Sequence, residues 1–408
     1  MHIPSARVHN EMRSEEAFWW VEPANGGDEI VILVKAPTPS IKALVEKCDT
    51  DLIFGLHANY LCSGIRIHDI PDSPLFISGA VRHTEEHEAI FKLLKDNSSP
   101  IFLFNEMDIC LAWSNIIINS NEAGRALELI GGVKALYTGK FDENCSHALD
   151  CFCHSTDKTQ NFSNALDIPF IEIKLSIEHW QSNSTYFYSV RESHAVTISD
   201  KNEGEIFERA IWASLESVFP LTLHKSPEVQ IGDNKRELTD ILAFHQYGSF
   251  LIEAKDLSVF QTGIGRSYER RTKGVQKQVK KAIGQLTGSY KALKRGDEIY
   301  DANGEKINAE RENPPHCIVL ITELTNSGDW SKIENELLKA IESTGAFFHL
   351  LDFRELIALL KGSSGKPELL EYNLIGRFKL FLQCKSVHIR SQPAPNKSMQ
   401  PITNATAD

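Results

Sequence analysis

Three ionisable residues in the second half of the chain stand at the spacing of a β-hairpin. Asp240 lies in one apolar run, and Glu253 and Lys255 lie in the next, after a short polar turn. A two-residue turn centred on Gln246-Tyr247 would place Asp240 directly opposite Glu253, because residues of a hairpin pair symmetrically outward from the turn. Glu253 and Lys255 share one face of their strand, because side chains alternate along a strand. Since like charges that face each other destabilise a sheet, the two carboxylates predict a compensating cation.

This arrangement predicts a magnesium or manganese site. The candidate ligands are the carboxylates of Asp240 and Glu253 and the backbone carbonyl of Ala254, because hard oxygen ligands suit Mg²⁺ and Mn²⁺. Such an ion lowers the pKa of a bound water and offsets negative charge on a phosphate. Lys255, two residues after Glu253, is expected to orient or deprotonate the attacking water and to stabilise the transition state.

Asp240 followed by Glu253-Ala254-Lys255 resembles the PD-(D/E)XK nuclease superfamily, which has the restriction-endonuclease-like fold. The resemblance covers residues 203–362. It departs from the family motif at Thr239, where the motif name has Pro. The resemblance implies that these residues hydrolyse phosphodiester bonds with Mg²⁺ or Mn²⁺.

Two further segments extend the resemblance. Gly204-Glu-Ile-Phe-Glu208 resembles the acidic motif of the family's first helix, which implies that Glu208 is an additional metal ligand. Lys281-Ala-Ile-Gly-Gln285-Leu286 resembles the glutamine-bearing helix that follows the catalytic strand, which implies that Gln285 orients groups at the site. Gln278 is an alternative, because it lies seven residues earlier on the same helix edge.

A strongly basic segment follows the acidic cluster, although the whole chain has a formal net charge of −12. Ten Lys or Arg residues and one acid, Glu269, lie between Arg266 and Arg295. A basic segment next to an acidic cluster is typical of a metal-dependent enzyme that acts on a polyanion, whereas a lysine-rich helix face alone is more often simply solvated. The candidate nucleic-acid-binding residues are Arg266, Arg270, Arg271, Lys273, Lys277 and Lys281.

The implied substrate is DNA, in a setting such as bacterial restriction or phage defence. Two alternatives remain. The first is a catalytically silent DNA-binding or scaffolding module on the same fold. The second is an RNA-cleaving enzyme, because the metal chemistry does not distinguish the sugar.

The hydrophobic pattern predicts a two-domain α/β protein with a tail. Residues 1–200 are expected to form a strand-rich α/β domain with a recognition, sensing or assembly role, through which the chain could form a homo-oligomer or bind a partner subunit. Residues 201–388 are expected to form a mixed central sheet flanked by helices, in the order helix, hairpin, helix, strand, helix, strand, helix. Residues 389–408 are rich in Pro, Asn, Ser and Thr and predict a disordered tail.

Two other groups of residues could bind zinc. His83-Thr-Glu-Glu-His87 matches a zinc-peptidase pattern, but Thr84 is predicted to cap a helix there, which would leave His83 outside the helix. The stretch 139–163 is predicted to be a polar loop, and its potential ligands lack the paired spacing of a zinc finger, so thiols without metal are favoured over a small structural site. These ligands are Cys145, His147, Cys151, Cys153 and His154.

The composition indicates a protein of the reducing cytoplasm that does not bind membranes. Eight cysteines in 408 residues are too sparse for a disulfide framework. No apolar run approaches the roughly 18 residues that a membrane-spanning helix needs, and the first residues lack the apolar segment of a secretory signal.

Overall fold

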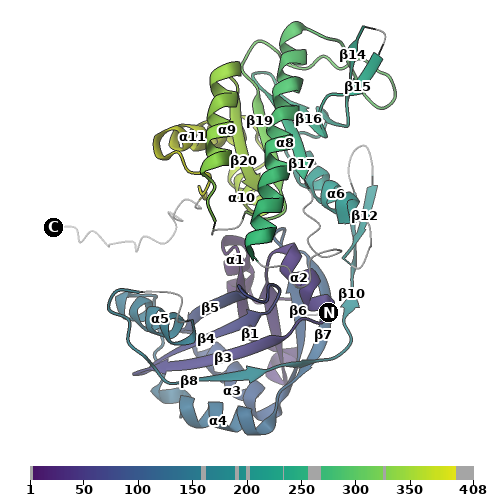
Figure 1. Ribbon diagram of the computed structural model, residues 1–408. Coiled ribbons are helices and arrows are strands. Elements are labelled where there is room, and N and C mark those ends of the chain that lie inside the picture. The colour runs from purple at the N-terminus through teal and green to yellow at the C-terminus, as the bar shows by residue number, and fades with distance from the viewer. Residues whose placement is uncertain are drawn as a thin grey trace, which may run out of the picture.

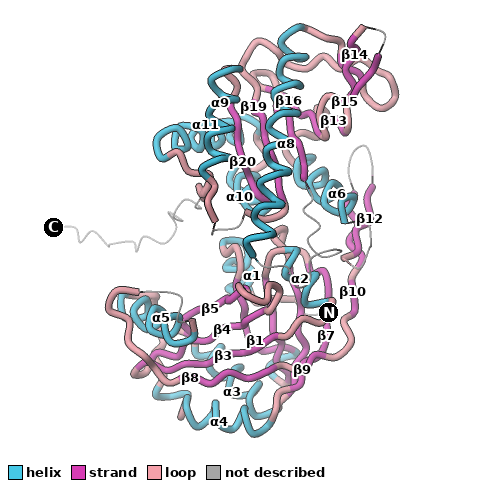
Figure 2. Tube along the Cα trace, viewed as in Figure 1, coloured by secondary structure: helices cyan, strands magenta, loops and turns pink. Residues whose placement is uncertain are grey.

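The computed structural model describes residues 3–157, 162–188, 193–198, 203–232, 234–255, 268–324 and 328–391. Figure 1 shows two α/β lobes, with the N-terminal half below and the C-terminal half above. Both lobes combine sheets with flanking helices, as the tube coloured by secondary structure also shows (Figure 2). The expectation of a mixed α/β protein is therefore confirmed.

Two sheets form the N-terminal half. The first has the order β1 (Phe18–Ala24), β2 (Glu29–Lys35), β6 (Ser98–Phe104), β7 (Cys110–Ile117) and β10 (Gln181–Ser182), and β9 (Ser176–Ile177) also pairs with β7. The second has the order β5 (Leu75–Val81), β4 (Tyr60–Ile67), β3 (Thr50–His57) and β8 (Phe170–Lys174). One apolar core includes residues of both sheets, so the two sheets fold as one unit.

Helices cover both sides of these sheets. Helices α3 (Thr84–Asp96) and α4 (Ser120–Ile130) pack into the shared core. On the opposite side, α1 (Ala6–Ser14) packs on the first sheet and α5 (Glu143–Thr156) on the second, each through its own smaller apolar cluster. Helix α2 (Thr38–Val45) follows β2, and a hairpin of β11 (Ser184–Tyr188) and β12 (Ser193–Thr197) precedes the C-terminal half.

The C-terminal half is built on a five-stranded sheet. Its order is β13 (Leu223–Lys225), β16 (Ile241–Phe244), β17 (Ser249–Lys255), β19 (His316–Ile321) and β20 (Phe347–Asp352). Strand β17 pairs antiparallel with β16 and parallel with β19, and β19 pairs parallel with β20. A separate small sheet contains β15 (Asn234–Glu237), β14 (Glu228–Ile231) and β18 (Ile299–Tyr300).

Both faces of the five-stranded sheet are buried, because successive side chains of β16 and β17 enter different cores. Leu242 and Leu251 pack with α8 (Tyr268–Arg295) and α9 (Ser331–Thr344). Ile241 and Ile252 pack on the other face, with α6 (Glu203–Glu216) and α10 (Phe353–Ser363). The central sheet with helices on both faces, and the order of its elements, are as the sequence predicts.

Three expectations about local structure are wrong. The stretch 139–163 is not a loop throughout, because α5 occupies its middle. Thr84 is not the cap of α3, because the helix begins at Thr84 and His83 is the capping residue. The last helix of the expected order is present as α10, but it does not end the domain, because α11 (Pro367–Cys384) follows it.

The expected disordered tail also begins too early. Ile389 is buried, and its carbonyl oxygen accepts a 2.6 Å hydrogen bond from the Arg377 guanidinium. Arg390 forms a bidentate ion pair of 2.6 and 2.7 Å with Asp352, which is fully buried. The ordered C-terminal domain therefore extends to at least Ser391, whose backbone N–H donates to Glu355. Residues 392–408 lie outside the described residues.

Asp108 links the two halves. One carboxylate oxygen accepts a 2.5 Å bond from Lys35, which is buried and also donates to the Met12 carbonyl oxygen. The other accepts a 2.7 Å bond from Lys361 of α10. The same acid thus neutralises a buried lysine of the N-terminal half and contacts a helix of the C-terminal half.

Replacing Arg390 should test whether residues 389–391 are part of the folded domain. Arg390→Gln would leave the buried Asp352 with backbone N–H partners but without its main cation, so we expect a loss of about 2 kcal/mol of unfolding free energy. Chemical denaturation of the purified chain measures this loss. Lys306→Gln removes an equally short but solvent-exposed pair with Glu298 and should leave stability nearly unchanged. Equal, small effects of both variants would contradict this assignment.

Candidate active site

The hairpin register places Asp240 opposite Glu253, as predicted. Ile241 pairs with Ile252 and Phe244 pairs with Ser249, so Gln246-Tyr247 is the centre of the turn. A hydrogen bond from the His245 N–H to the Gly248 carbonyl oxygen closes the turn. Strand β16 begins at Ile241, so Asp240 immediately precedes it and lies at the end of β17 where the chain leaves the sheet.

Asp240, Glu253 and Lys255 meet at this point. The Lys255 ammonium lies 2.7 Å from Glu253 Oε2 and 3.4 Å from Asp240 Oδ2. The backbone N–H of Ala254 donates a 2.7 Å bond to the same Asp240 oxygen. The site therefore contains one positive charge between two carboxylates. The backbone of β17 fixes the position of the Asp240 carboxylate.

Thr239 holds the segment before Asp240 against β17. Its side chain is buried, and its hydroxyl donates a 2.7 Å bond to the Ile252 carbonyl oxygen. This bond continues the pairing of the two strands past the first residue of β16. In the sequence, Thr239 stands out only because the name of the family motif has Pro at this position. The spacing of the motif residues does not predict its hydrogen bond to Ile252.

Burial makes the charges unequal. Glu253 is 2% exposed, whereas the side chains of Asp240 and Lys255 are 23% and 16% exposed. Burial first, and then the negative charge of Asp240, raise the pKa of Glu253 to about 7, although Lys255 opposes both effects. Burial acts to lower the pKa of Lys255, but the bond and charge of Glu253 and the charge of Asp240 outweigh it, so the net shift is upward. The lysine is therefore strongly held in its charged form.

The donor atoms at this site fit a divalent cation. The described residues donate no hydrogen bond to Oδ1 of Asp240 or to Oε1 of Glu253. The N–H of Ala254 points toward Asp240, and the N–H and C=O of one strand residue point the same way, so the Ala254 carbonyl oxygen lies on that side too. Oxygen donors of this kind are the ligands that Mg²⁺ and Mn²⁺ take.

Glu208, the expected additional ligand, makes its described ion pair away from Asp240 and Glu253. It belongs to α6 and forms a 3.3 Å ion pair with Lys225 of β13. Lys225 pairs with Ile241, whose side chain packs under α6, so this ion pair lies on the face of the sheet opposite to Leu242. No contact of the described residues joins Glu208 to Asp240 or Glu253.

The side chains of Gln285 and Gln278 are exposed on α8, and no described contact joins either to the acidic pair. Helix α8 nevertheless packs beside the site, because the Ser289 hydroxyl, one turn after Gln285, donates to the carbonyl oxygen of Leu238. The structure thus brings the predicted helix to the site but does not bring the predicted glutamine into contact with it.

The predicted basic surface is partly formed by α8. Arg270, Lys277 and Lys281 are exposed, and Lys273 is exposed but forms a 2.6 Å pair with Glu269. Arg271 is half-buried, and Arg266 lies outside the described residues. Lys280, which is not among the predicted residues, forms an ion pair with Glu336 of α9.

Among the described residues, neither of the two zinc patterns brings all of its candidate ligands together. His83 Nε2 lies 3.8 Å from Glu11, and His87 is buried with Nε2 against the Val81 carbonyl oxygen, so the two histidines do not converge. Along α5, Cys145 contacts the Lys140 carbonyl oxygen, Cys153 contacts Ser78, and His154 lies 4.0 Å from Asp167. His147 and Cys151 face each other, at 3.7 Å.

Comparisons with known proteins identify no family for this chain, because no family model, curated protein or solved structure matches it. Within the described residues, no helix combines the length and apolarity required to cross a membrane.

The raised pKa of Glu253 predicts how stability depends on pH. Because the folded state binds this proton more tightly than the unfolded state, the stabilisation is complete at low pH and is lost as pH rises through about 7. In metal-free buffer, the unfolding free energy of the wild type should fall relative to that of Glu253→Gln by roughly 1 to 3 kcal/mol between about pH 5 and 8.

Denaturant titrations across this pH range, with EDTA present, measure the difference. Glu312→Gln, at an exposed position, is the control and should follow the wild type. A wild type that gains stability relative to Glu253→Gln as pH rises would show that Glu253 is charged and well compensated at low pH.

Proposed function

We propose that this chain is a metal-dependent nuclease of the PD-(D/E)XK type, with Asp240, Glu253 and Lys255 at its active centre. The observation that carries the proposal is that the Lys255 ammonium lies 2.7 and 3.4 Å from two carboxylates that the hairpin register places opposite each other. An ion pair that served stability alone would need one acid for one lysine. Here two acids share one lysine, and burial together with the charge of Asp240 raises the pKa of Glu253, which favours a role for an additional cation.

The order of elements supports the proposal. Helix α6, the β16–β17 hairpin, α8, β19, α9 and β20 follow one another as the family resemblance implies for a restriction-endonuclease-like fold. Strand β17, which carries Glu253 and Lys255, lies in the middle of the sheet between β16 and β19. A central strand with partners on both sides holds its side chains rigidly, and a catalytic centre requires this.

Each residue has a distinct proposed role. Asp240, Glu253 and the Ala254 carbonyl oxygen would hold Mg²⁺ or Mn²⁺, and the bound ion would supply an activated water and offset phosphate charge. Lys255 keeps its proton and donates it in hydrogen bonds, so it would orient the attacking water and stabilise the negative charge that develops on the phosphate. Thr239 would position Asp240 through its bond to the Ile252 carbonyl oxygen.

The proposed substrate is DNA. Exposed Arg270, Lys277 and Lys281 lie on α8, the helix that packs beside the active centre, so a phosphate backbone bound there would run close to Asp240 and Glu253. The N-terminal half contributes none of the three proposed catalytic residues. We therefore assign it the recognition, sensing or assembly role, with Asp108 and Lys361 in the contact between the halves.

Removing the Lys255 ammonium should abolish most cleavage. We expect Lys255→Ala to reduce the cleavage rate by at least about 100-fold, because a preorganised charged donor at the phosphate is lost. Plasmid, linear duplex, single-stranded DNA and RNA are each incubated with Mg²⁺ or Mn²⁺, and Lys306→Ala serves as the control for loss of an exposed lysine. Cleavage that survives Lys255→Ala, or that continues in EDTA, would contradict the mechanism. Preference for RNA would change the substrate but not the mechanism.

Removing Glu253 should separate binding from cleavage. Glu253→Ala removes one negative charge from a polyanion site, so we expect cleavage to be lost while DNA affinity stays equal or increases. The double variant Lys277→Ala/Lys281→Ala should instead weaken binding and reduce its salt dependence. Fluorescence anisotropy with labelled duplex in EDTA measures both. Sharply weaker binding by a folded Glu253→Ala would show that this acid has a structural role. Wild type that binds but never cleaves would favour the silent module.

A further inference from the structure

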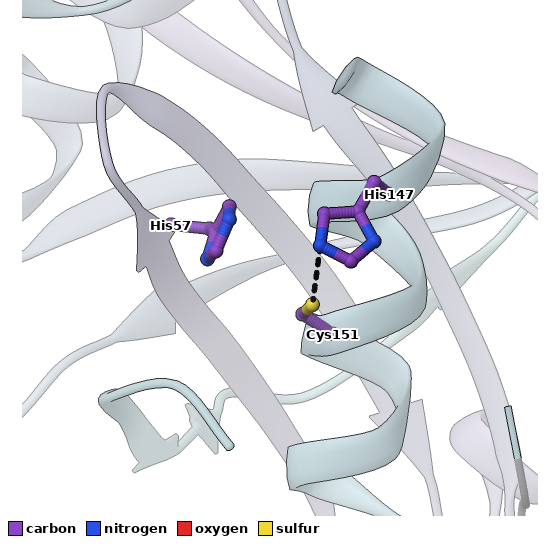
Figure 3. Close-up of side chains that lie close together, drawn as sticks. All are labelled: His57, His147 and Cys151. Carbon is purple, nitrogen blue, oxygen red and sulfur yellow. Dashed lines mark hydrogen bonds between the residues drawn. The ribbon is translucent and has the colours of Figure 1, made fainter. Parts of the chain in front are cut away.

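Three potential metal ligands converge in the N-terminal half, in a place distinct from the acidic pair. His57 lies at the end of β3, and His147 and Cys151 lie one turn apart on α5 (Figure 3). One nitrogen of each imidazole and the Cys151 sulfur all lie within 4.8 Å of one another. Strands β4, β5, β6 and β7 lie between His57 and His147 in the sequence, so only the fold brings these residues together.

Local structure fixes each ligand. His147 and Cys151 are four residues apart and so share one face of α5. His57 pairs with Tyr60 across a tight turn in which Ala58 has a φ of +54°, and the Asn59 carbonyl oxygen accepts a bond from Tyr137. Gly55, two residues before His57, permits the close approach of α5, because a Cβ there would lie 2.5 Å from the Phe152 ring.

The spacing fits a tetrahedral ion. Usual zinc–sulfur and zinc–nitrogen bond lengths place a cysteine sulfur and a histidine nitrogen about 3.5 Å apart at a tetrahedral centre. The Cys151 sulfur lies 3.7 Å from His147 Nε2. The His57 ring is edge-on to the His147 ring, with centroids 5.3 Å apart and planes at 86°, so both rings can direct a nitrogen at one point.

The surroundings favour a bound thiolate. Cys151 is fully buried, and the backbone N–H of Leu166 donates to its sulfur at 3.2 Å, as in the outer shell of thiolate–metal sites. A hydrogen bond between Cys151 and His147 would explain those two side chains alone. It would leave His57 beside them without a hydrogen bond or ion pair from any described residue. A cation bound by all three accounts for the whole group.

We propose that His57, His147 and Cys151 form a Zn²⁺ site that fastens α5 to the end of the β3–β4 hairpin. One thiolate and two imidazoles are ligands that select zinc over Mg²⁺ or Ca²⁺, so the site differs in chemistry from the acidic pair. Binding replaces the thiol proton of Cys151, which passes to solvent, with a sulfur–zinc bond. Three protein ligands leave one tetrahedral position for a solvent molecule or an added ligand.

Metal binding by the intact chain tests the proposal. After the chain is stripped with EDTA and recharged with Zn²⁺, we expect one ion per chain. Cys151→Ser, His57→Gln and His147→Gln should each weaken zinc binding at least about ten-fold. Cys153→Ser and His154→Gln, on the same helix but outside the group, are the matched controls and should bind as the wild type does. Equal zinc binding by ligand and control variants would overturn the proposal.

A spectroscopic test on the unsubstituted chain does not depend on how the variants fold. Co²⁺ in place of Zn²⁺ should give a thiolate-to-metal charge-transfer band, and X-ray absorption of the zinc form should show one sulfur at about 2.3 Å and two imidazole nitrogens at about 2.0 Å. A folded wild type that takes up neither ion, or binds it without a sulfur ligand or with several, would overturn the proposal. Neither result bears on cleavage, because the acidic pair lies in the other half of the chain.

Discussion

The pairing of Asp240 with Glu253 is the constraint around which the C-terminal half is arranged. Two carboxylates at the end of a central strand repel each other, and the apolar surroundings of Glu253 strengthen that repulsion. Lys255, the Ala254 N–H and the Thr239 hydroxyl hold the segment together despite it. A divalent cation of the kind proposed above would offset this repulsion.

The cores on the two faces of the sheet make this possible. Leu242 and Leu251 anchor the face under α8 and α9, and Ile241 and Ile252 anchor the face under α6 and α10. Because a slip of one residue would move every one of these side chains to the wrong face, the register is fixed by burial along the whole hairpin. The unfavourable contact at its end is thus tolerated through favourable packing elsewhere.

Much of this arrangement follows from sequence, and its failures have physical causes. The hairpin register could be predicted, because alternation and turn length leave few solutions. The sequence does not predict helix α5, because its polar and cysteine-rich residues form no clear apolar stripe. It places Arg390 in a tail because a buried ion pair has no hydrophobic signature. Glu208 and Gln285 were assigned by resemblance, and the distance of a side chain from a site depends on helix rotation, which spacing does not determine. His57 could not be predicted as a partner of Cys151, since their contact depends on how the second sheet and α5 pack.

The shared carboxylate of Asp108 has a consequence for how the molecule can be divided. Lys35 already neutralises this acid from within the N-terminal half, so Lys361 adds a second cation rather than the first. If α10 were withdrawn, Asp108 would keep Lys35 as its counterion, so breaking this one contact would leave neither Asp108 nor Lys35 unpaired. The Lys361–Asp108 contact therefore adds little to the electrostatic cost of separating the two halves.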